Sequence, residues 1–280
     1  MKDKILVLTD FSNNAYDAAF FACQLAQQKS YKIHLLHYYT VKSSRFDEEE
    51  DAPEHKHPML LKADLLIIEM YGKLEAAFPD IKISISCKRG LLEEKLSNEL
   101  KNGEYKFIVM GLKGESQHQS LLWGSTTAMI TEKSDVPVWV IPSGRDTYKQ
   151  GKIGLLTNFK AEELTTLRKF TQLNGKIDNL ELIHVIQSSE EEKDTLNRLE
   201  TWIVNFKDWE DIKSVNPIIG CTEEDTESTV PEVINTLVFQ QGIEGLIITK
   251  TRRSFFRRLF EKSISKTLSN QLIVPTFFDK

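Results

Sequence analysis

Residues 5–11 read ILVLTDF and residues 153–159 read IGLLTNF, so the same apolar segment and the same turn residues occur twice in the chain. Two further pairs of segments repeat in the same order: IHLLHY at 33–38 with LELIHV at 180–185, and DVPVWVIP at 135–142 with LIVPTFF at 272–278. Solenoid proteins repeat with periods of roughly 20 to 50 residues. A single repeat of much longer period therefore predicts two similar domains.

The first copy predicts alternating strands and helices. An apolar strand at 5–8 precedes a helix at 14–28, in which alanines recur near helical spacing, and Ser12 or Asn13 is a suitable N-cap. A second apolar strand follows at 32–38. Strand, helix and strand form a βαβ unit, which predicts a parallel sheet. The later elements expected in this copy are helices at 60–78, 91–100 and 125–132 and strands at 82–87, 107–110 and 136–141.

We therefore expect an α/β protein of two tandem flavodoxin-like domains with mainly parallel sheets, at residues 1–143 and 151–280. The segment between them, 143–152, is polar and contains two glycines. Residues 41–58 carry the acidic run DEEED and two prolines, which predicts an exposed insertion between the second strand and the second helix.

Composition excludes several classes of protein. The chain has 280 residues, 40% of them hydrophobic, with 41 acidic and 36 basic residues and a net charge of -5. A dedicated nucleic-acid binder usually shows a strongly basic face. No apolar run approaches the roughly 20 residues that span a bilayer, and the N-terminus lacks the pattern of a signal peptide. Three scattered cysteines without a CxxC pair indicate a reduced, cytoplasmic setting.

A run of glycines at 108–126, IVMGLKGESQHQSLLWGST, is the sharpest motif in the chain. Gly111 follows an expected strand, Gly114 comes three residues later, and Gly124 and Ser125 open an expected helix. Gly111 allows a turn with positive φ, and Gly114 allows close approach of a ligand. The N–H groups at the helix start favour an anion, with Ser125 and Thr126 as hydroxyl donors. The pattern favours a phosphate-bearing ligand, although glycines that only make turns and a serine that only caps a helix would look the same.

Asp10 ends the first expected strand at the same edge of the sheet, where open α/β sheets bind ligands. Its carboxylate is suited to accept hydrogen bonds from ribose hydroxyls or to hold Mg²⁺ against phosphates. A negative charge favourable to the following helix dipole explains the same residue, and both roles are compatible.

These residues together carry a resemblance to a known family. TDFS at 9–12, HLLHYY at 34–39 and the G-x2-G-x9-G-S run followed by VPVWVIP resemble the universal stress proteins of the UspA-like type. The resemblance covers both halves, so the chain is similar to tandem members of this family, which has an adenine nucleotide alpha hydrolase-like fold.

The resemblance implies a site for ATP in the first half. Its triphosphate would lie along a set of small residues, namely Gly111, Gly114, Gly124, Ser125 and Thr126. The other implied contacts are the backbone near Tyr38 for adenine, Thr9 and Asp10 beside the ribose or Mg²⁺, and Met110 and Glu115 flanking the loop. Leu8 replaces a proline that is frequent in the family, and Tyr38 replaces a frequent valine and could narrow the pocket.

The second copy lacks this motif. Aligning Pro137 with Pro275 places Thr249, Arg252 and Lys262 opposite the three glycines, and Asn158 stands opposite Asp10. We expect that this copy does not bind ATP in the family manner and serves as a structural partner. Its segment 250–262 reads KTRRSFFRRLFEK. The arginines either bind an anionic partner or belong to a solvated basic segment whose phenylalanines pack inward. We favour the second interpretation.

Three functions remain open. The first is an ATP-binding regulator of a stress response with an unidentified protein partner. The second is a nucleotide-free scaffold for dimerisation or interaction. The third is a slow ATPase, disfavoured because no general base is evident near a γ-phosphate. The resemblance also implies that the last strands of the two copies pair within one chain, and homodimerisation of whole chains is open.

Other reactive residues are read as structural. His37 and His184 occupy matching strand positions and are interpreted as strand residues, and His55 and His57 as exposed residues, rather than as metal ligands. Cys87 precedes two cations that would lower its pKa, but a buried inert thiol is the commoner case.

Overall fold

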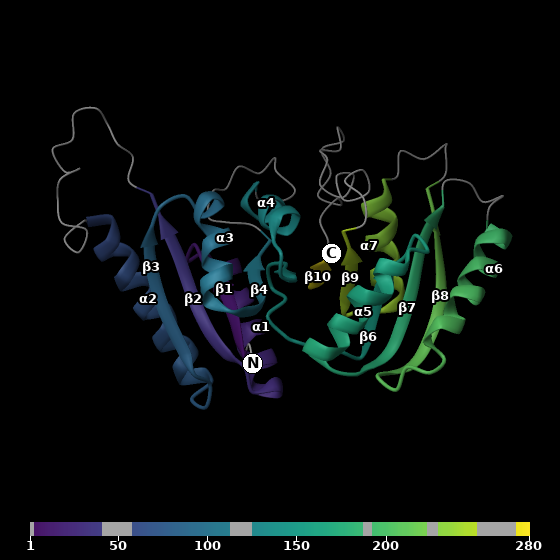
Figure 1. Cartoon of the computed structure of the whole chain (residues 1–280), viewed down its shortest axis with the longest axis horizontal. Coiled ribbons are helices and arrows are strands. Elements are labelled where there is room, and N and C mark those ends of the chain that lie inside the picture. The colour runs from purple at the N-terminus through teal and green to yellow at the C-terminus, as the bar shows by residue number, and fades with distance from the viewer. Residues whose placement is uncertain (1–2, 41–57, 113–124, 187–191, 223–228, 251–272) are drawn as a thin grey trace. The chain divides into compact units, whose positions relative to one another are not determined.

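The computed structural model describes residues 3–40, 58–112, 125–186, 192–222, 229–250 and 273–280 (Figure 1). The chain divides into two compact units. The first comprises Met1–Gln117 with Met129–Tyr148, and the second comprises His118–Ala128 with Lys149–Lys280. Among the described residues, no helix combines the length and the apolar character that crossing a membrane requires.

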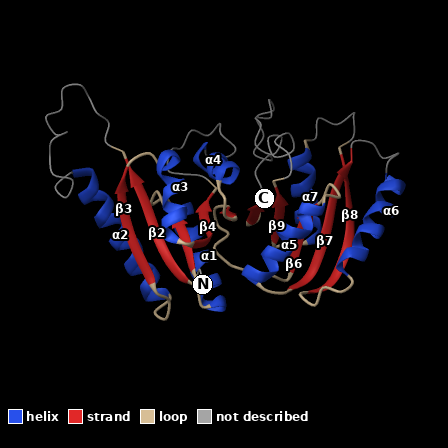
Figure 2. Ribbon diagram, viewed as in Figure 1, coloured by secondary structure: helices blue, strands red, loops and turns tan. Residues whose placement is uncertain are grey.

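The first half forms a parallel sheet with the strand order β3-β2-β1-β4-β5. Figure 2 draws strands in red and helices in blue. The strands of this sheet are β1 (Lys4–Leu8), β2 (Lys32–Tyr39), β3 (Ile83–Arg89), β4 (Tyr105–Gly111) and β5 (Val138–Ile141). The helices described between them are α1 (Asn13–Lys29), α2 (Pro58–Ala77), α3 (Leu92–Gly103) and α4 (Ser125–Lys133). The predicted alternation of strands and helices is confirmed, and most element ends lie within two residues of their expected places.

Strand β1 is buried along its apolar stretch because it lies in the interior of the sheet. Ile5, Leu6 and Val7 have no exposed surface, as the continuous apolar run predicts for a strand covered on both faces. Helix α1 lies against β1 and β4 through small side chains. These are Ala15, Ala18, Ala19, Ala22 and Ala26, all buried. Alanine lets the helix axis approach the sheet closely.

Ser12 caps helix α1, which confirms one of the two N-cap candidates. Its extended backbone and its Oγ, which accepts from the Ala15 N–H at 3.2 Å, have the geometry of an N-cap. The helix ends at Ser30, whose φ of 55° lies in the left-handed region.

Gly111 does not have the positive φ that we expected, because it continues strand β4 and pairs with Ile141. Its lack of a side chain has another cause. A Cβ atom there would lie 2.9 Å from Oδ1 and 3.0 Å from the carbonyl oxygen of Asn14. Asn14 is buried in the first turn of α1, and its Nδ2 donates to the Ile141 carbonyl at 2.9 Å. The glycine thus permits contact between this helix and the end of β4.

The second half repeats the topology, with the parallel order β8-β7-β6-β9-β10. Its strands are β6 (Lys152–Leu156), β7 (Ile177–Ile186), β8 (Ile212–Cys221), β9 (Gly245–Thr249) and β10 (Thr276–Asp279). The helices described here are α5 (Ala161–Asn174), α6 (Glu192–Ile203), the short 3₁₀ helix η4 (Val204–Phe206) and α7 (Val230–Gln241). The two halves therefore share one α/β architecture, as the repeated sequence predicts.

The contact at Gly111 yields a stability prediction. Gly111→Ala should lower the free energy of unfolding by about 1–3 kcal/mol, because the added methyl group overpacks against Asn14. Urea denaturation followed by circular dichroism measures this change. Gly72→Ala is the matched control: no atom lies within 4 Å of a Cβ at this helical position, so this variant should gain up to about 1 kcal/mol. Equal stability of Gly111→Ala and the parent protein would contradict the packing explanation.

Candidate functional site

The segment that follows β1 is held by hydrogen bonds within the chain. Thr9 is buried, and its N–H donates to the Leu36 carbonyl at 3.1 Å. Its hydroxyl donates to Sδ of Met70 at 3.4 Å and accepts from the Phe11 N–H at 3.0 Å. The Thr9 side chain therefore shapes the turn at the end of the strand.

Asp10 is half-buried and supports the cap of helix α1. Its Oδ1 accepts from the N–H of Ser12 at 3.1 Å and from the hydroxyl of Ser12 at 2.7 Å. Ser12 in turn accepts from the Ala15 N–H. The carboxylate thus orients the capping serine and places a negative charge at the start of the helix, as the structural interpretation of Asp10 expects.

His37 completes the turn from the neighbouring strand. Its Nδ1 donates to the Thr9 carbonyl at 2.7 Å, and its ring lies 4.4 Å from the ring of Phe11, measured between centroids. Phe11 has a φ of 67°, a left-handed conformation that is costly for a residue with a bulky side chain. The histidine bond and the ring contact help to hold this strained residue in place.

The same turn occurs in the second half. The Phe159 N–H donates to Oγ1 of Thr157 at 3.0 Å, and Phe159 has a φ of 60°. The ring of His184 lies 4.9 Å from that of Phe159, and its Nδ1 donates to the Thr157 carbonyl at 2.7 Å. Sequence reasoning placed both histidines on strands but missed this role. The matching order Thr-x-Phe followed by His in both repeats is the signal that could have revealed it.

The hydroxyl of Tyr38 joins a polar cluster around Glu99 of helix α3. It donates to Oε2 of Glu99 at 3.4 Å, while Lys88 lies 2.5 Å from the same oxygen and Tyr105 donates to Oε1 at 2.9 Å. Burial and the Glu99 carboxylate raise the pKa of Tyr38 to about 12. Burial alone would raise the pKa of Glu99, but the hydrogen bonds from Lys88 and Tyr105 outweigh it and the pKa is lowered. The neutral hydroxyl of Tyr38 therefore donates to an ionised Glu99, and this bond holds the tyrosine ring in place.

The glycine run is described at its two ends. Met110 is buried in β4, and Gly111 ends this strand, whereas Gly114, Glu115 and Gly124 lie outside the described residues. Helix α4 begins at Ser125, as the sequence predicts, and Thr126 in its first turn is exposed. The motif therefore starts at the carboxyl end of a parallel strand and finishes at the first residue of a helix.

The comparisons with known proteins decide the family. Residues 1–142 match the model of the universal stress protein family. The chain belongs to the universal stress protein family. A universal stress protein from Archaeoglobus fulgidus DSM 4304 is 19% identical, with a TM-score of 0.69, over 100% of this chain and 99% of that one. A protein of unknown function from Pseudomonas aeruginosa PAO1 is 12% identical, with a TM-score of 0.55, over 99% and 92% of the two chains.

At these identities the two solved structures show the fold alone, and they extend it over both halves of this universal stress protein. No curated protein sequence matches the chain at a significant level. The tandem flavodoxin-like fold expected from the sequence is thereby confirmed. The exact domain boundaries, 1–143 and 151–280, stay a prediction.

In the second half, a longer side chain braces the turn after β6. Glu163, in the first turn of α5, accepts from the Thr157 hydroxyl at 2.6 Å and from the Asn158 N–H at 2.8 Å. Burial raises the pKa of Glu163, although these hydrogen bonds oppose the shift. Thr249, which aligns with Gly111, is buried at the end of β9. A carboxylate from the helix thus replaces the aspartate and serine of the first half.

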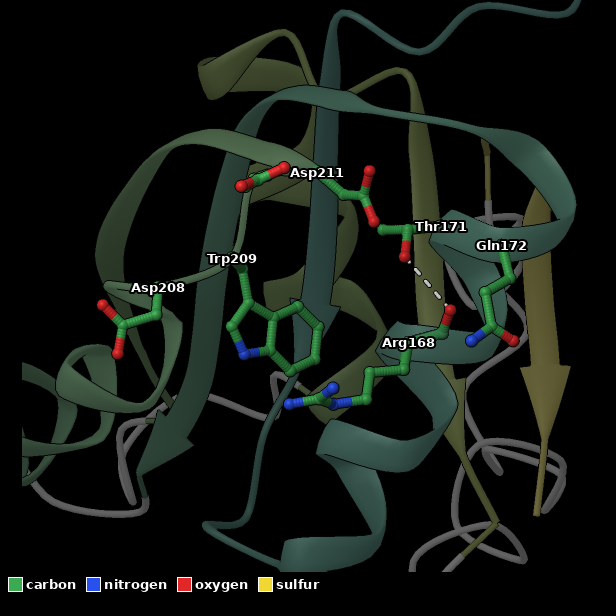
Figure 3. A pocket seen from close by; sticks show the side chains of 7 residues that line it. Arg168, Thr171, Gln172, Asp208, Trp209 and Asp211 are labelled. Atoms are coloured by element: carbon green, nitrogen blue, oxygen red, sulfur yellow. Dashed lines mark hydrogen bonds between the residues drawn. The ribbon is translucent and has the colours of Figure 1, made fainter.

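Two pockets are lined by described residues of the second half. One, of about 190 Å³, lies beside the turn before β8, at the amino-terminal edge of the strands (Figure 3). The guanidinium group of Arg168, one of its lining residues, lies 4.4 Å from the centre of the Trp209 ring. This cation–π contact ties α5 to the turn. Ligands of open α/β sheets bind at the opposite, carboxyl edge, so we assign this pocket a structural origin.

The other pocket, of about 320 Å³, lies beside the repeated turn. It is lined by Phe159, Asn197, Arg198, Thr201 and Trp202. The Arg198 guanidinium lies 4.2 Å from the ring of Phe159, which is 6.2 Å from that of Trp202. Sequence reasoning predicted neither pocket, because both depend on contacts between elements distant in the chain.

The described residues contain little other reactive chemistry. Cys87 is half-buried, and burial is the main cause that raises its pKa to about 12, with a further contribution from Asp64, which disfavours the reactive thiolate. Within the described ranges, no three His, Cys, Asp or Glu residues gather as a metal site would require. His55 and His57 lie outside these ranges.

The turn around Asp10 yields a prediction. Asp10→Ala should lower the free energy of unfolding by about 1 kcal/mol, because Ser12 loses the acceptor that orients its cap. Asp10→Asn, which introduces the residue type found at position 158 of the second half, keeps an acceptor oxygen and should cost less than about 0.5 kcal/mol. Chemical denaturation of the three proteins measures both changes. A loss as large for asparagine as for alanine would show that charge, not hydrogen bonding, is what the turn needs.

Glu163 makes stability depend on pH. Its raised pKa means that the folded protein holds this proton more tightly than the unfolded chain does, so its contribution is greatest at low pH and is lost as the pH rises through the folded pKa. Glu163→Gln removes that titration. The free energy of unfolding of the variant, relative to the parent, should therefore rise between pH 4 and pH 8 in urea titrations. A difference that stays constant over this range would contradict the assignment.

Proposed function

We propose that this universal stress protein binds ATP in its first half and regulates a stress response. One observation carries the proposal above the others. The run G-x2-G-x9-G-S begins at the carboxyl end of β4 and finishes at the first residue of α4. Open α/β sheets bind their ligands outside the carboxyl ends of the strands, and a helix N-terminus favours phosphate.

The residues that we propose to hold the phosphates are small. Gly111, Gly114 and Gly124 would let a phosphate chain approach the backbone, and Ser125 and Thr126 would add N–H and hydroxyl donors. The first N–H groups of an α-helix in general have no acceptor within the helix, which is what makes a helix N-terminus suitable for anions.

The remaining contacts would come from the ends of β1, β2 and β4. We propose Thr9 and Asp10 for the ribose side, the backbone at Tyr38 for adenine, and Met110 and Glu115 as residues beside the loop. Asp10 is a half-buried carboxylate, a ligand type that Mg²⁺ accepts. Its described role as the acceptor for Ser12 is compatible with a metal contact, since a carboxylate has several lone pairs.

The second half is proposed to bind no ATP. Thr249, Arg252 and Lys262 stand where the glycines would be required, and the buried Thr249 side chain lies at the strand end. We further propose that the two halves pair within the chain, that the protein acts in the cytoplasm, and that an unidentified protein partner reads its nucleotide state.

The glycine at the helix start gives the decisive test. Isothermal titration with Mg-ATP should detect binding to the parent protein, and Gly124→Val should weaken it by at least about 100-fold, equivalent to about 2.7 kcal/mol. The valine side chain would block backbone approach. Lys262→Val, at the aligned position of the second half, is the matched control and should leave the affinity unchanged.

The other functions give different results. A nucleotide-free scaffold would show no heat of binding with any of the three proteins. A slow ATPase would release phosphate over hours in proportion to bound nucleotide, whereas a regulator would not. If Gly124→Val folds normally and binds as tightly as the parent protein, the phosphate site is not at this loop.

A further inference from the structure

Helix α2 is apolar on two opposite faces. One face packs on the sheet through a row of buried side chains, namely Ala63, Ile67, Met70 and Leu74, and the buried Phe78 follows directly after the helix. On the other side, Leu61, Leu65 and Ile68 are 51%, 71% and 55% exposed. A surface helix usually has one apolar face turned to the core and a polar face turned to water. The second apolar face therefore indicates a contact beyond the core of this unit.

The exposed residues have the spacing of a helix-pairing seam. Leu61, Leu65, Ile68 and Gly72 follow one another at intervals of four, three and four residues, the alternation of the a and d positions of a heptad. Gly72 is exposed, and no atom lies within 4 Å of a Cβ built on it. No described neighbour in this unit therefore requires a glycine here, although glycine weakens the interior of a helix.

We propose that this seam, Leu61–Leu65–Ile68–Gly72, is a homodimer interface that pairs with the same seam of a second copy of the chain, the two helices running antiparallel. Size complementarity supports a second copy as the occupant. A two-fold axis midway between Leu65 and Ile68 sets Leu61 over Gly72 of the partner subunit. It also sets Leu65 against Ile68 of the partner subunit. A large residue thus meets an open position at both ends of the seam, and two aliphatic residues meet at its centre.

Charge complementarity supports the same arrangement. Lys62 and Glu69 border the seam on one side, both exposed. In an antiparallel pair, residues on one border face the same border of the other helix, so Lys62 approaches Glu69 of the partner subunit, and the symmetry makes this contact twice. Within its own helix Glu69 pairs with Lys73 at 2.7 Å. A carboxylate can accept from both lysines.

The size of the seam sets the strength of the dimer. Its four positions span about three helical turns. We expect a contact this short to bury less than the roughly 800 Å² per partner of a standard stable interface. The dimer is therefore a weak one that dissociates at micromolar rather than nanomolar concentrations. This pairing uses an edge helix of the first half and is independent of nucleotide binding.

Sedimentation velocity of the full chain over a range of concentrations tests the proposal. The parent protein should pass from 32.2 kDa to twice this mass as its concentration rises through the micromolar range. Leu65→Lys should raise the dissociation constant at least tenfold. Gly72→Leu should do the same while leaving the thermal midpoint unchanged or higher, because leucine favours the helix and no described atom lies within 4 Å of its Cβ position. Phe239→Lys, at an 82% exposed apolar residue of α7, is the matched control and should not alter association.

Charge-reversal variants distinguish a specific antiparallel pair from nonspecific self-association. Lys62→Glu alone and Glu69→Lys alone should each weaken self-association, because each brings like charges together twice. A mixture of the two variants should form a heterodimer at least as readily as the parent protein dimerises, since every border pair is then complementary. A monomer at all concentrations overturns the proposal, as does a dimer that Leu65→Lys and Gly72→Leu leave intact. Failure of the mixture to associate better than either variant overturns the antiparallel register.

Discussion

The hydrogen bond from a histidine ring to a threonine carbonyl determines how each half leaves its central strand. In a parallel sheet every strand must release the chain at the same edge, where backbone groups lose their ladder partners. His37 and His184 satisfy the carbonyls of Thr9 and Thr157, and the following phenylalanines take a left-handed conformation against the histidine rings. That turn sets the direction of the following helix. The start of this helix borders the carboxyl edge of the sheet, where a ligand would bind.

From this shared turn the two halves diverge in what they place at the edge. The first half uses short groups, an aspartate that orients a capping serine and a glycine that lies against Asn14. The second half uses longer ones, the buried carboxylate of Glu163 and the buried side chain of Thr249. Among the described residues, longer side chains brace the turn of the second half, and the short groups of the first half suit the phosphate site that we propose there. This difference supports our proposal that the first half binds the nucleotide and the second half is structural.

The fold was predictable because its signals are local and repeated. Continuous apolar runs such as Ile5–Leu8, each followed by a helical pattern, identify parallel strands without tertiary information. The role of Gly111 was not predictable in the same way, since its cause is Asn14, nearly one hundred positions away in sequence. The same holds for the bond between Tyr38 and Glu99. The spacing of a motif locates a candidate site. The residues that contact the motif depend on the packing of segments that are distant in sequence.

The number of nucleotides held by one chain tests the central claim most directly. Native mass spectrometry of the full protein in Mg-ATP counts them without assuming where they bind. One bound nucleotide per chain, lost on substitution of Gly124 and kept on substitution of Lys262, is the result that this account predicts. A chain that binds none at millimolar ATP, or one that binds two, would contradict a division into a nucleotide-binding half and a structural half.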